Sequence, residues 1–308
     1  MKWQSLLPAG VKPDFIVVGG PTASGKSAVA LEMAKTLGGS IVCCDSVQIY
    51  RGFDIGSAKP TKAEQAAVPH YLFDLLSWDE PCDAAIYAAK AKEAIASIKA
   101  LGRIPVVVGG TGLYLRALLG ESWDDDLPGD QELRQRLGLR ASDDLYQELQ
   151  AKDPRRAAEL HVNDRFRVIR ALEINILTGH PVRQASAATP AERSHVMVFM
   201  NPPRETLYER INARVGQMLQ DGLVDEVKGL LENGVRADCK PIGSIGYKEV
   251  IQMLSGELKP DDLETAIATA TRRYAKRQVT WFKKVASDGV VENPHSVPDL
   301  FAHLRDLL

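Results

Sequence analysis

Short apolar runs alternate with stretches of helical periodicity over the first 120 residues. The runs at residues 15–18, 41–44 and 104–108 are rich in β-branched side chains and predict buried strands. Residues 26–37 and 84–101 have apolar side chains at helical spacing, and glycine follows each stretch, as it often follows the end of a helix. Strands that alternate with helices predict an α/β fold with a largely parallel sheet.

The pattern changes after residue 120. Only helical periodicity is present from residue 130 to about 179, most clearly over 165–177. Residues 184–191 are rich in Ala, Ser, Thr and Pro and predict a linker, after which strand character returns at 195–200. Helical patterns then cover most of 205–231 and 263–285. We therefore predict one α/β catalytic core, residues 1–120 and 195–308, interrupted by a helical insertion, residues 121–194.

Composition and charge narrow the class of protein. The chain has 308 residues, of which 45% are hydrophobic and 25% charged, as is typical of soluble globular proteins. Its formal net charge of −2 excludes a global basic field, so nucleic acid would need a local basic patch. The four cysteines lack the C-x-x-C spacing of a zinc site, and we expect reduced thiols. No apolar stretch resembles a signal peptide or spans a bilayer, so we expect a cytoplasmic protein without a membrane partner.

A phosphate-binding loop follows the first predicted strand and opens the first predicted helix. Its residues fit G-x-x-x-x-G-K-[ST] in full. Backbone N–H groups and the helix N-terminus, which carries about half a positive charge, favour a bound anion. The lysine adds a full charge, and the final serine hydroxyl is a candidate Mg²⁺ ligand. We predict binding of a diphosphate or triphosphate by Gly20, Pro21, Thr22, Ala23, Ser24, Gly25, Lys26 and Ser27.

The loop alone does not identify the reaction. Asp45 directly follows the second apolar run and is the best candidate for holding Mg²⁺ through water, as P-loop NTPases require. The third apolar run ends in Gly-Gly-Thr-Gly instead, and the guanine-reading motif N-K-x-D is absent from the sequence. A kinase for a nucleotide or small metabolite remains open on these residues.

Residues 45–60, D-S-V-Q-I-Y-R-G-F-D-I-G-S-A-K-P, are similar to a segment of the tRNA dimethylallyltransferases (tRNA isopentenyltransferases). In that family the segment follows a phosphate loop of the form GPTASGK[ST]. Further resemblances lie at residues 69–71, 108–114, 163–173, 245–249 and 276–281. The matching motifs occur in the same order across most of the chain, which makes them far more specific together than singly.

The resemblance implies a P-loop α/β core with an all-helical insertion that binds the anticodon stem of tRNA. The family transfers a dimethylallyl group from dimethylallyl diphosphate to N6 of adenosine 37, in tRNAs that read codons starting with U. The products are N6-dimethylallyladenosine and diphosphate. The phosphate loop would then hold an isoprenoid diphosphate, with Mg²⁺ as cofactor and Ser27 as its ligand. We expect the protein to act as a monomer on the anticodon stem-loop.

Three residues receive catalytic roles from the resemblance. Asp45 is the general base for the adenine amine, which is a poor nucleophile because its lone pair is delocalised; a metal ligand or helix cap is the alternative. Thr22 donates to the oxygen of the breaking C–O bond, or is ordinary loop structure. Arg214 faces the leaving diphosphate, or forms a surface ion pair with Glu209 or Asp225.

Basic and polar residues are the candidates for tRNA binding. Residues 272–284 place Arg and Lys on one helical face, and residues 165–170 hold a second cluster, although either could be a solvated surface. Trp281 and Phe282 are expected in the core. With the resemblance, the predicted tRNA-binding residues are Asp45, Ser46, Val47, Gln48, Thr111, Arg134, Arg165, Phe166, Arg167, Arg170, Gly246, Tyr247, Lys276 and Arg277.

Three other functions remain as alternatives. The first is a P-loop kinase, but the sequence has few candidate metal ligands for one. The second is a non-catalytic RNA-binding protein, but Lys26 and Ser27 are intact beside Asp45. Prenylation of free AMP, as in plant-hormone-synthesising relatives, would not need a helical insertion or two basic clusters.

Overall fold

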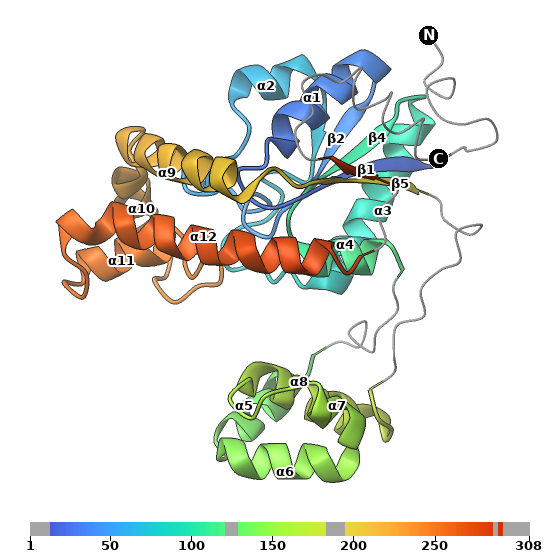
Figure 1. Ribbon diagram of the computed structural model, residues 1–308, viewed down its shortest axis with the longest axis vertical. Coiled ribbons are helices and arrows are strands. Elements are labelled where there is room, and N and C mark those ends of the chain that lie inside the picture. Colours follow the sequence, from blue (N-terminus) through green and yellow to red (C-terminus); the bar gives the residue numbers. More distant parts are fainter. Residues whose placement is uncertain (1–12, 121–128, 183–194, 286–288, 292–308) are drawn as a thin grey trace. The chain divides into compact units, whose positions relative to one another are not determined.

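The computed structural model describes residues 13–120, 129–182, 195–285 and 289–291. It divides the chain into two compact units, Met1–Leu118 with Thr189–Leu308 and Leu119–Ala188 (Figure 1). The predicted linker at residues 184–191 lies outside the described residues. The second unit compares with the insertion predicted at 121–194: it begins two residues earlier and ends six residues earlier.

The first unit is built on a parallel sheet of six strands in the order β3-β2-β4-β1-β5-β6. Strands β1 and β4 pair with Val17 opposite Val107, and β2 and β4 with Cys44 opposite Gly109. Crossover helices join the strands, as a parallel sheet requires. The strands are β1 (Phe15–Gly19), β2 (Ser40–Cys44), β3 (His70–Tyr71), β4 (Pro105–Gly109), β5 (His195–Met200) and β6 (Gly289–Val291).

The central strands are buried on both faces, which explains their continuous apolar sequence. Met33 and Ala34 of the first helix pack with Ile16, Val106 and Val198 in the main core. The helices of this unit are α1 (Lys26–Leu37), α2 (Lys62–Ala67), α3 (Ala84–Ala100), α4 (Gly112–Leu118), α9 (Arg204–Gln220), α10 (Leu223–Glu232), α11 (Tyr247–Leu254) and α12 (Leu263–Phe282), with a 3₁₀ turn at Pro260–Asp262.

The second unit is wholly helical in its described residues. It consists of α5 (Gln131–Gly138), α6 (Ser142–Lys152), α7 (Pro154–Ala158) and α8 (Arg165–Thr178). Leu133, Leu145, Leu149 and Leu172 form its own apolar core. Asp130 begins α5 by accepting a hydrogen bond from Leu133 N, a common helix N-cap. The unit thus has the core that an independent insertion needs.

The predicted α/β class is confirmed, and the long predicted elements lie where expected to within a few residues. The helical stretch expected over 205–231 divides into α9 and α10, because Gly222 takes a left-handed conformation with φ +96°. No helix in the described part of the chain has the length and apolarity that crossing a membrane needs.

Candidate active site

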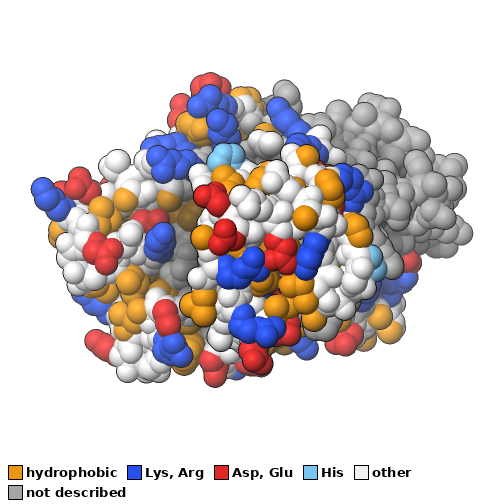
Figure 2. Space-filling model, turned by 90° about the horizontal axis from the view of Figure 1, so that it is seen from below, with side chains coloured by type: hydrophobic (Ala, Val, Ile, Leu, Met, Phe, Trp, Pro, Cys, Tyr) orange, Lys and Arg blue, Asp and Glu red, His pale blue; other side chains and the backbone are white. Residues whose placement is uncertain are grey.

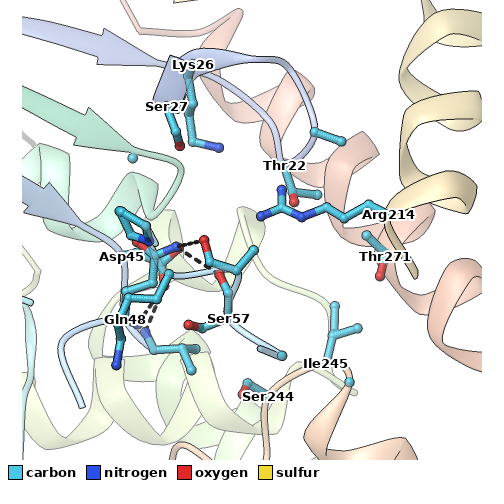
Figure 3. A pocket seen from close by; sticks show the side chains of 18 of the residues that line it. Thr22, Lys26, Ser27, Asp45, Gln48, Ser57, Arg214, Ser244, Ile245 and Thr271 are labelled. Atoms are coloured by element: carbon cyan, nitrogen blue, oxygen red, sulfur yellow. Dashed lines mark hydrogen bonds between the residues drawn. The ribbon is translucent and has the colours of Figure 1, made fainter. Parts of the chain in front are cut away.

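The site lies at the carboxyl ends of β1, β2 and β4, where ligands bind in open α/β sheets. These strands are neighbours in the sheet, so the loops that follow them meet. The loops and helices α9 and α12 line a cavity of about 690 Å³. Thr22, Lys26, Asp45, Thr271 and Arg214 are among its lining residues, and Figure 3 shows them around one space.

The predicted phosphate loop has the backbone that anion binding needs. Ala23 and Gly25 both have positive φ, +62° and +89°, and α1 begins directly afterwards at Lys26. The loop also runs close to β5, because a Cβ added to Gly20 would lie 2.7 Å from Met200 O. The N-terminus of α1 therefore faces the cavity with its partial positive charge.

Lys26 and Arg214 are two of the cations that line the cavity, and they come from different elements. Lys26 Nζ donates to Pro21 O over 3.1 Å, and Arg214 extends from α9 toward Asp45 (Figure 3). Burial, and then the charge of Arg214, lower the pKa of Lys26 to about 8 despite the opposing effect of Asp45. Burial likewise lowers the pKa of Arg214. Partly buried cations, of which one lowers the pKa of the other, favour a multiply charged anion between them.

Asp45 is held by its own loop. Its Oδ1 accepts hydrogen bonds from Val47 N over 2.8 Å and Gln48 N over 3.2 Å. Oδ2 is then the oxygen available to accept a proton. The Gln48 amide is fixed as well, since Nε2 donates to Ser57 O over 2.8 Å and to Ala58 O over 3.1 Å.

Thr111 joins the loops after β2 and β4. Its Oγ1 accepts from Ser46 N over 3.1 Å, next to Asp45. The two strands approach so closely here that a Cβ on Gly109 would lie 1.9 Å from Cys44 O. Glycine at position 109 is therefore required by the packing of the two strands.

Sequence reasoning missed two residues that organise the site. Gln278 on α12 accepts from Thr22 N and donates to Gly110 O, each over 2.9 Å. Glu226 on α10 accepts from the backbone N–H groups of Asp54, Ile55 and Gly56 and from the Tyr247 hydroxyl. The motif around Gln278 was recognised, but its bonds depend on tertiary contacts that the sequence does not reveal.

Tyr247 supports the site from beneath its surface. It was predicted to bind tRNA, but its side chain is fully buried and its hydroxyl donates to Glu226 Oε1 over 2.7 Å. Gly246 lines the cavity, whereas Lys276 is exposed on α12. Arg277 also lines the cavity and lies over the Tyr274 ring, 5.6 Å from its centroid. Phe282 is buried as expected, with 1% exposed.

The predicted tRNA-binding residues of the insertion divide into two groups. Arg134 and Arg170 pair with Glu173, a fully buried carboxylate, over 2.9 Å and 2.5 Å. Arg165 donates to Gly138 O, Arg140 O and Ser142 Oγ, so it ties helices together. Phe166, 77% exposed, and Arg167, whose side chain is 65% exposed, are the members presented to solvent.

The charge distribution agrees with a local rather than a global anion site. Figure 2 shows acidic and basic side chains interspersed over the face it draws. In the described part of the chain, no group of three or more His, Cys, Asp or Glu side chains could hold a metal ion. Ser27 and Asp45 both line the cavity, and their side-chain oxygens are of the kind that binds a Mg²⁺ shared with substrate phosphates.

Comparison with known proteins gives one consistent family. The family model described as IPP transferase matches residues 48–285. A tRNA dimethylallyltransferase 1 of Trichlorobacter lovleyi is 47% identical over 89% of this chain and 92% of its own. The tRNA isopentenylpyrophosphate transferase of Bacillus halodurans has a TM-score of 0.70 and 35% identity, covering 96% of this chain and 98% of that chain. The structure of a eukaryotic dimethylallyltransferase acting on tRNA has a TM-score of 0.70 and 27% identity. The match covers 87% of this chain and 69% of that chain. The chain belongs to the IPP transferase family.

Proposed function

We propose that the protein transfers the dimethylallyl group of dimethylallyl diphosphate to tRNA, at N6 of adenosine 37 in tRNAs that read codons starting with U. The observation that carries this proposal is the convergence of Lys26, Arg214 and Asp45 on one cavity. Two cations and a phosphate loop suit the diphosphate, and a fixed carboxylate suits the amine. The names of the relatives agree with transfer to tRNA.

The proposed reaction is a displacement at the first carbon of the dimethylallyl group. The N6 lone pair forms the new C–N bond while the C–O bond to the diphosphate breaks and its electrons leave on oxygen. Asp45 Oδ2 takes the proton that N6 loses, which makes the lone pair available for attack. General-base assistance of this kind contributes roughly 10²- to 10⁴-fold in rate.

The leaving diphosphate gains negative charge, which needs cations already in place. Lys26 and Arg214 supply that charge in a partly buried cavity, where it acts more strongly than in water. Thr22 would donate its hydroxyl proton to the bridging oxygen of the breaking bond. When bound, Mg²⁺ would neutralise part of the negative charge of the diphosphate, and Ser27 would be its protein ligand.

The acceptor adenine lies in an RNA loop and must leave its stack to reach Asp45. Gln48, Ser46 and Thr111 lie beside Asp45 and would contact the base and its neighbours. Lys276 and Arg277 on α12 would bind the phosphates of the loop. Phe166 and Arg167 of the insertion would bind the anticodon stem. The protein would act as a monomer in the cytoplasm.

A mass measurement tests the function. The protein, Mg²⁺, dimethylallyl diphosphate and unmodified tRNA are incubated, and the RNA is digested to nucleosides. Parallel reactions contain free AMP in place of tRNA, or ATP in place of the isoprenoid. We expect a five-carbon gain on one adenosine of the tRNA and no gain on AMP.

Two results would contradict the proposal. Consumption of ATP without prenylation would indicate a kinase and would make Asp45 a metal ligand. A five-carbon gain on AMP at a rate equal to that on tRNA would indicate that tRNA is not the acceptor that the site selects.

A further inference from the structure

The Gln278 side chain bridges two loops of the active site. Thr22 N donates to Gln278 Oε1 over 2.9 Å, and Gln278 Nε2 donates to Gly110 O over 2.9 Å. Thr22 belongs to the phosphate loop after β1, and Gly110 directly precedes Thr111 in the loop after β4. One amide thus joins the loop that holds the diphosphate to the loop beside the acceptor.

The amide is tightly enclosed. Gln278 is 6% exposed, and a Cβ on Gly110 would lie 2.3 Å from Gln278 Nε2 and 2.9 Å from Gly20 O. One turn further along α12, the Phe282 ring stacks on Phe199 of β5 with centroids 5.1 Å apart. The helix is therefore fixed against the sheet, and so is the position from which Gln278 reaches the loops.

These two bonds need one acceptor and one donor at the end of the same side chain. An amide has both, a carboxylate has no proton for Gly110 O, and an aliphatic side chain has neither. Either change would leave a buried backbone group without its partner, which is costly. The chemistry of the position thus demands an amide for reasons internal to the protein.

The bridge also determines how Thr22 and Thr111 lie. The Thr22 N–H points to α12 instead of into the cavity, while the Thr22 side chain lines the cavity (Figure 3). On the other side, Thr111 Oγ1 accepts from Ser46 N, next to Asp45. Three hydrogen bonds and the peptide link between Gly110 and Thr111 therefore connect the phosphate loop to the segment that carries the proposed base.

We propose that Gln278 is a positioning residue, which sets the spacing between the phosphate loop and the Thr111–Asp45 side of the cavity and does not itself contact tRNA. This inference rests on the proposed function. Small displacements of reacting groups are expensive, and one of about 1 Å costs on the order of 10²-fold in rate.

Two variants and a control test the proposal. Gln278→Leu removes both bonds, Gln278→Glu keeps the acceptor, and Gln220→Glu makes the same charge change at an exposed position of α9. The measurements are kcat at saturating substrates and the tRNA dissociation constant. We expect Gln278→Leu to lower kcat on the order of 10²-fold with unchanged tRNA binding.

The pH dependence of kcat for Gln278→Glu gives a second readout. It tests the proposal even if Gln278→Leu does not fold. A protonated carboxyl accepts from Thr22 N and donates to Gly110 O as the amide does, and burial favours that neutral form. The ratio of variant to wild-type kcat should rise as pH falls. The charged and titratable side chains Lys26, Asp45, Arg214, Tyr274 and Arg277 line the same cavity in both proteins.

The outcomes separate the inference from the function beneath it. Weaker tRNA binding with unchanged kcat would place Gln278 in the RNA interface and overturn the inference. A kcat ratio for Gln278→Glu that does not change with pH, as we expect for Gln220→Glu, would overturn it as well. Absence of transfer by the wild-type protein would reject the proposed function itself.

Discussion

Burial and fixed hydrogen-bond partners set the orientation and the available charge of individual residues in the site. Asp45 is held through Oδ1 by two backbone N–H groups, and Lys59 is held through three acceptors, Tyr50 O, Asp54 and Asp74. Lys59 lines the cavity, but these partners occupy the three protons of its ammonium group. Arg210 and Arg277 line the cavity as well, but Lys26 and Arg214 are the pair whose charges act on each other, and we expect the diphosphate to contact these two.

Asp45→Asn should slow transfer and leave binding intact. The amide keeps the shape of the side chain but cannot take the proton from N6, so we expect a loss of at least ~10²-fold in kcat. Single-turnover transfer and tRNA binding should be measured on the same preparation. Near-normal turnover would show that Asp45 is not the base.

Lys26 predicts a pH dependence of diphosphate binding. Its pKa of about 8 in the unliganded protein means that the ammonium loses its charge as pH rises above that value. A bound diphosphate favours the charged form, so binding above pH 8 must take up a proton. We expect the dissociation constant of dimethylallyl diphosphate, without tRNA, to rise about tenfold per pH unit there.

Calorimetry in two buffers of different ionisation enthalpy checks this prediction. The apparent enthalpy should differ between the buffers above pH 8 and converge well below it. Lys35→Gln, an exposed lysine on the same helix, should behave like the wild type. An affinity that stays constant through pH 8 would contradict the assigned role of Lys26.

At the scale of elements, the sequence predicted what local patterns determine. The central strands and α1, α3 and α8 have long, regular apolar patterns, and they form where predicted. β3 has two residues and α2 has six, too few for a period to be visible. Gly246 is the N-cap of α11, and Glu249 Oε2 accepts from Gly246 N, a capping contact that was not identified in the sequence.

The same reasoning explains which site residues were predicted. The phosphate loop and Asp45 are local motifs at strand ends, so the sequence reveals them. Gln278 and Glu226 bind backbone groups more than 160 residues away, and only the fold shows those contacts. Burial of Tyr247 and pairing of Arg134 with Glu173 were likewise invisible in the sequence.

Glu226 should contribute to stability by attaching α10 to the 54–56 loop. Its carboxylate accepts three backbone N–H groups and the Tyr247 hydroxyl. Glu226→Gln places an amide donor among those donors, and we expect a loss of about 1–3 kcal/mol in the free energy of unfolding. Denaturant unfolding measures it, with Glu232→Gln at the exposed end of α10 as the control. Equal stability of the two variants would contradict the role.

At the scale of the whole molecule, a net charge of −2 has to be reconciled with binding to RNA. Arg272 is engaged with Asn212 and Thr269, which leaves Arg273, Lys276 and Arg277 as exposed cations of α12, and Arg277 also lines the cavity. We expect Arg273→Gln with Lys276→Gln to weaken tRNA binding and to reduce the salt slope by about 2.

Binding titrations across a range of salt concentrations measure that slope. Lys35→Gln with Lys62→Gln removes the same charge from exposed positions of α1 and α2 and should leave the slope unchanged. Equal slopes for the two double variants would place the RNA surface elsewhere on the protein.

The most direct test of the account replaces the acceptor atom. In the test tRNA, adenosine 37 is replaced by purine riboside, which lacks the N6 amine. In a matched tRNA, the same replacement is made at a neighbouring adenosine and adenosine 37 is kept. We predict a five-carbon gain on the matched tRNA and none on the tRNA without the amine at position 37. A gain on both would contradict the proposed acceptor and the role of Asp45 in removing its proton.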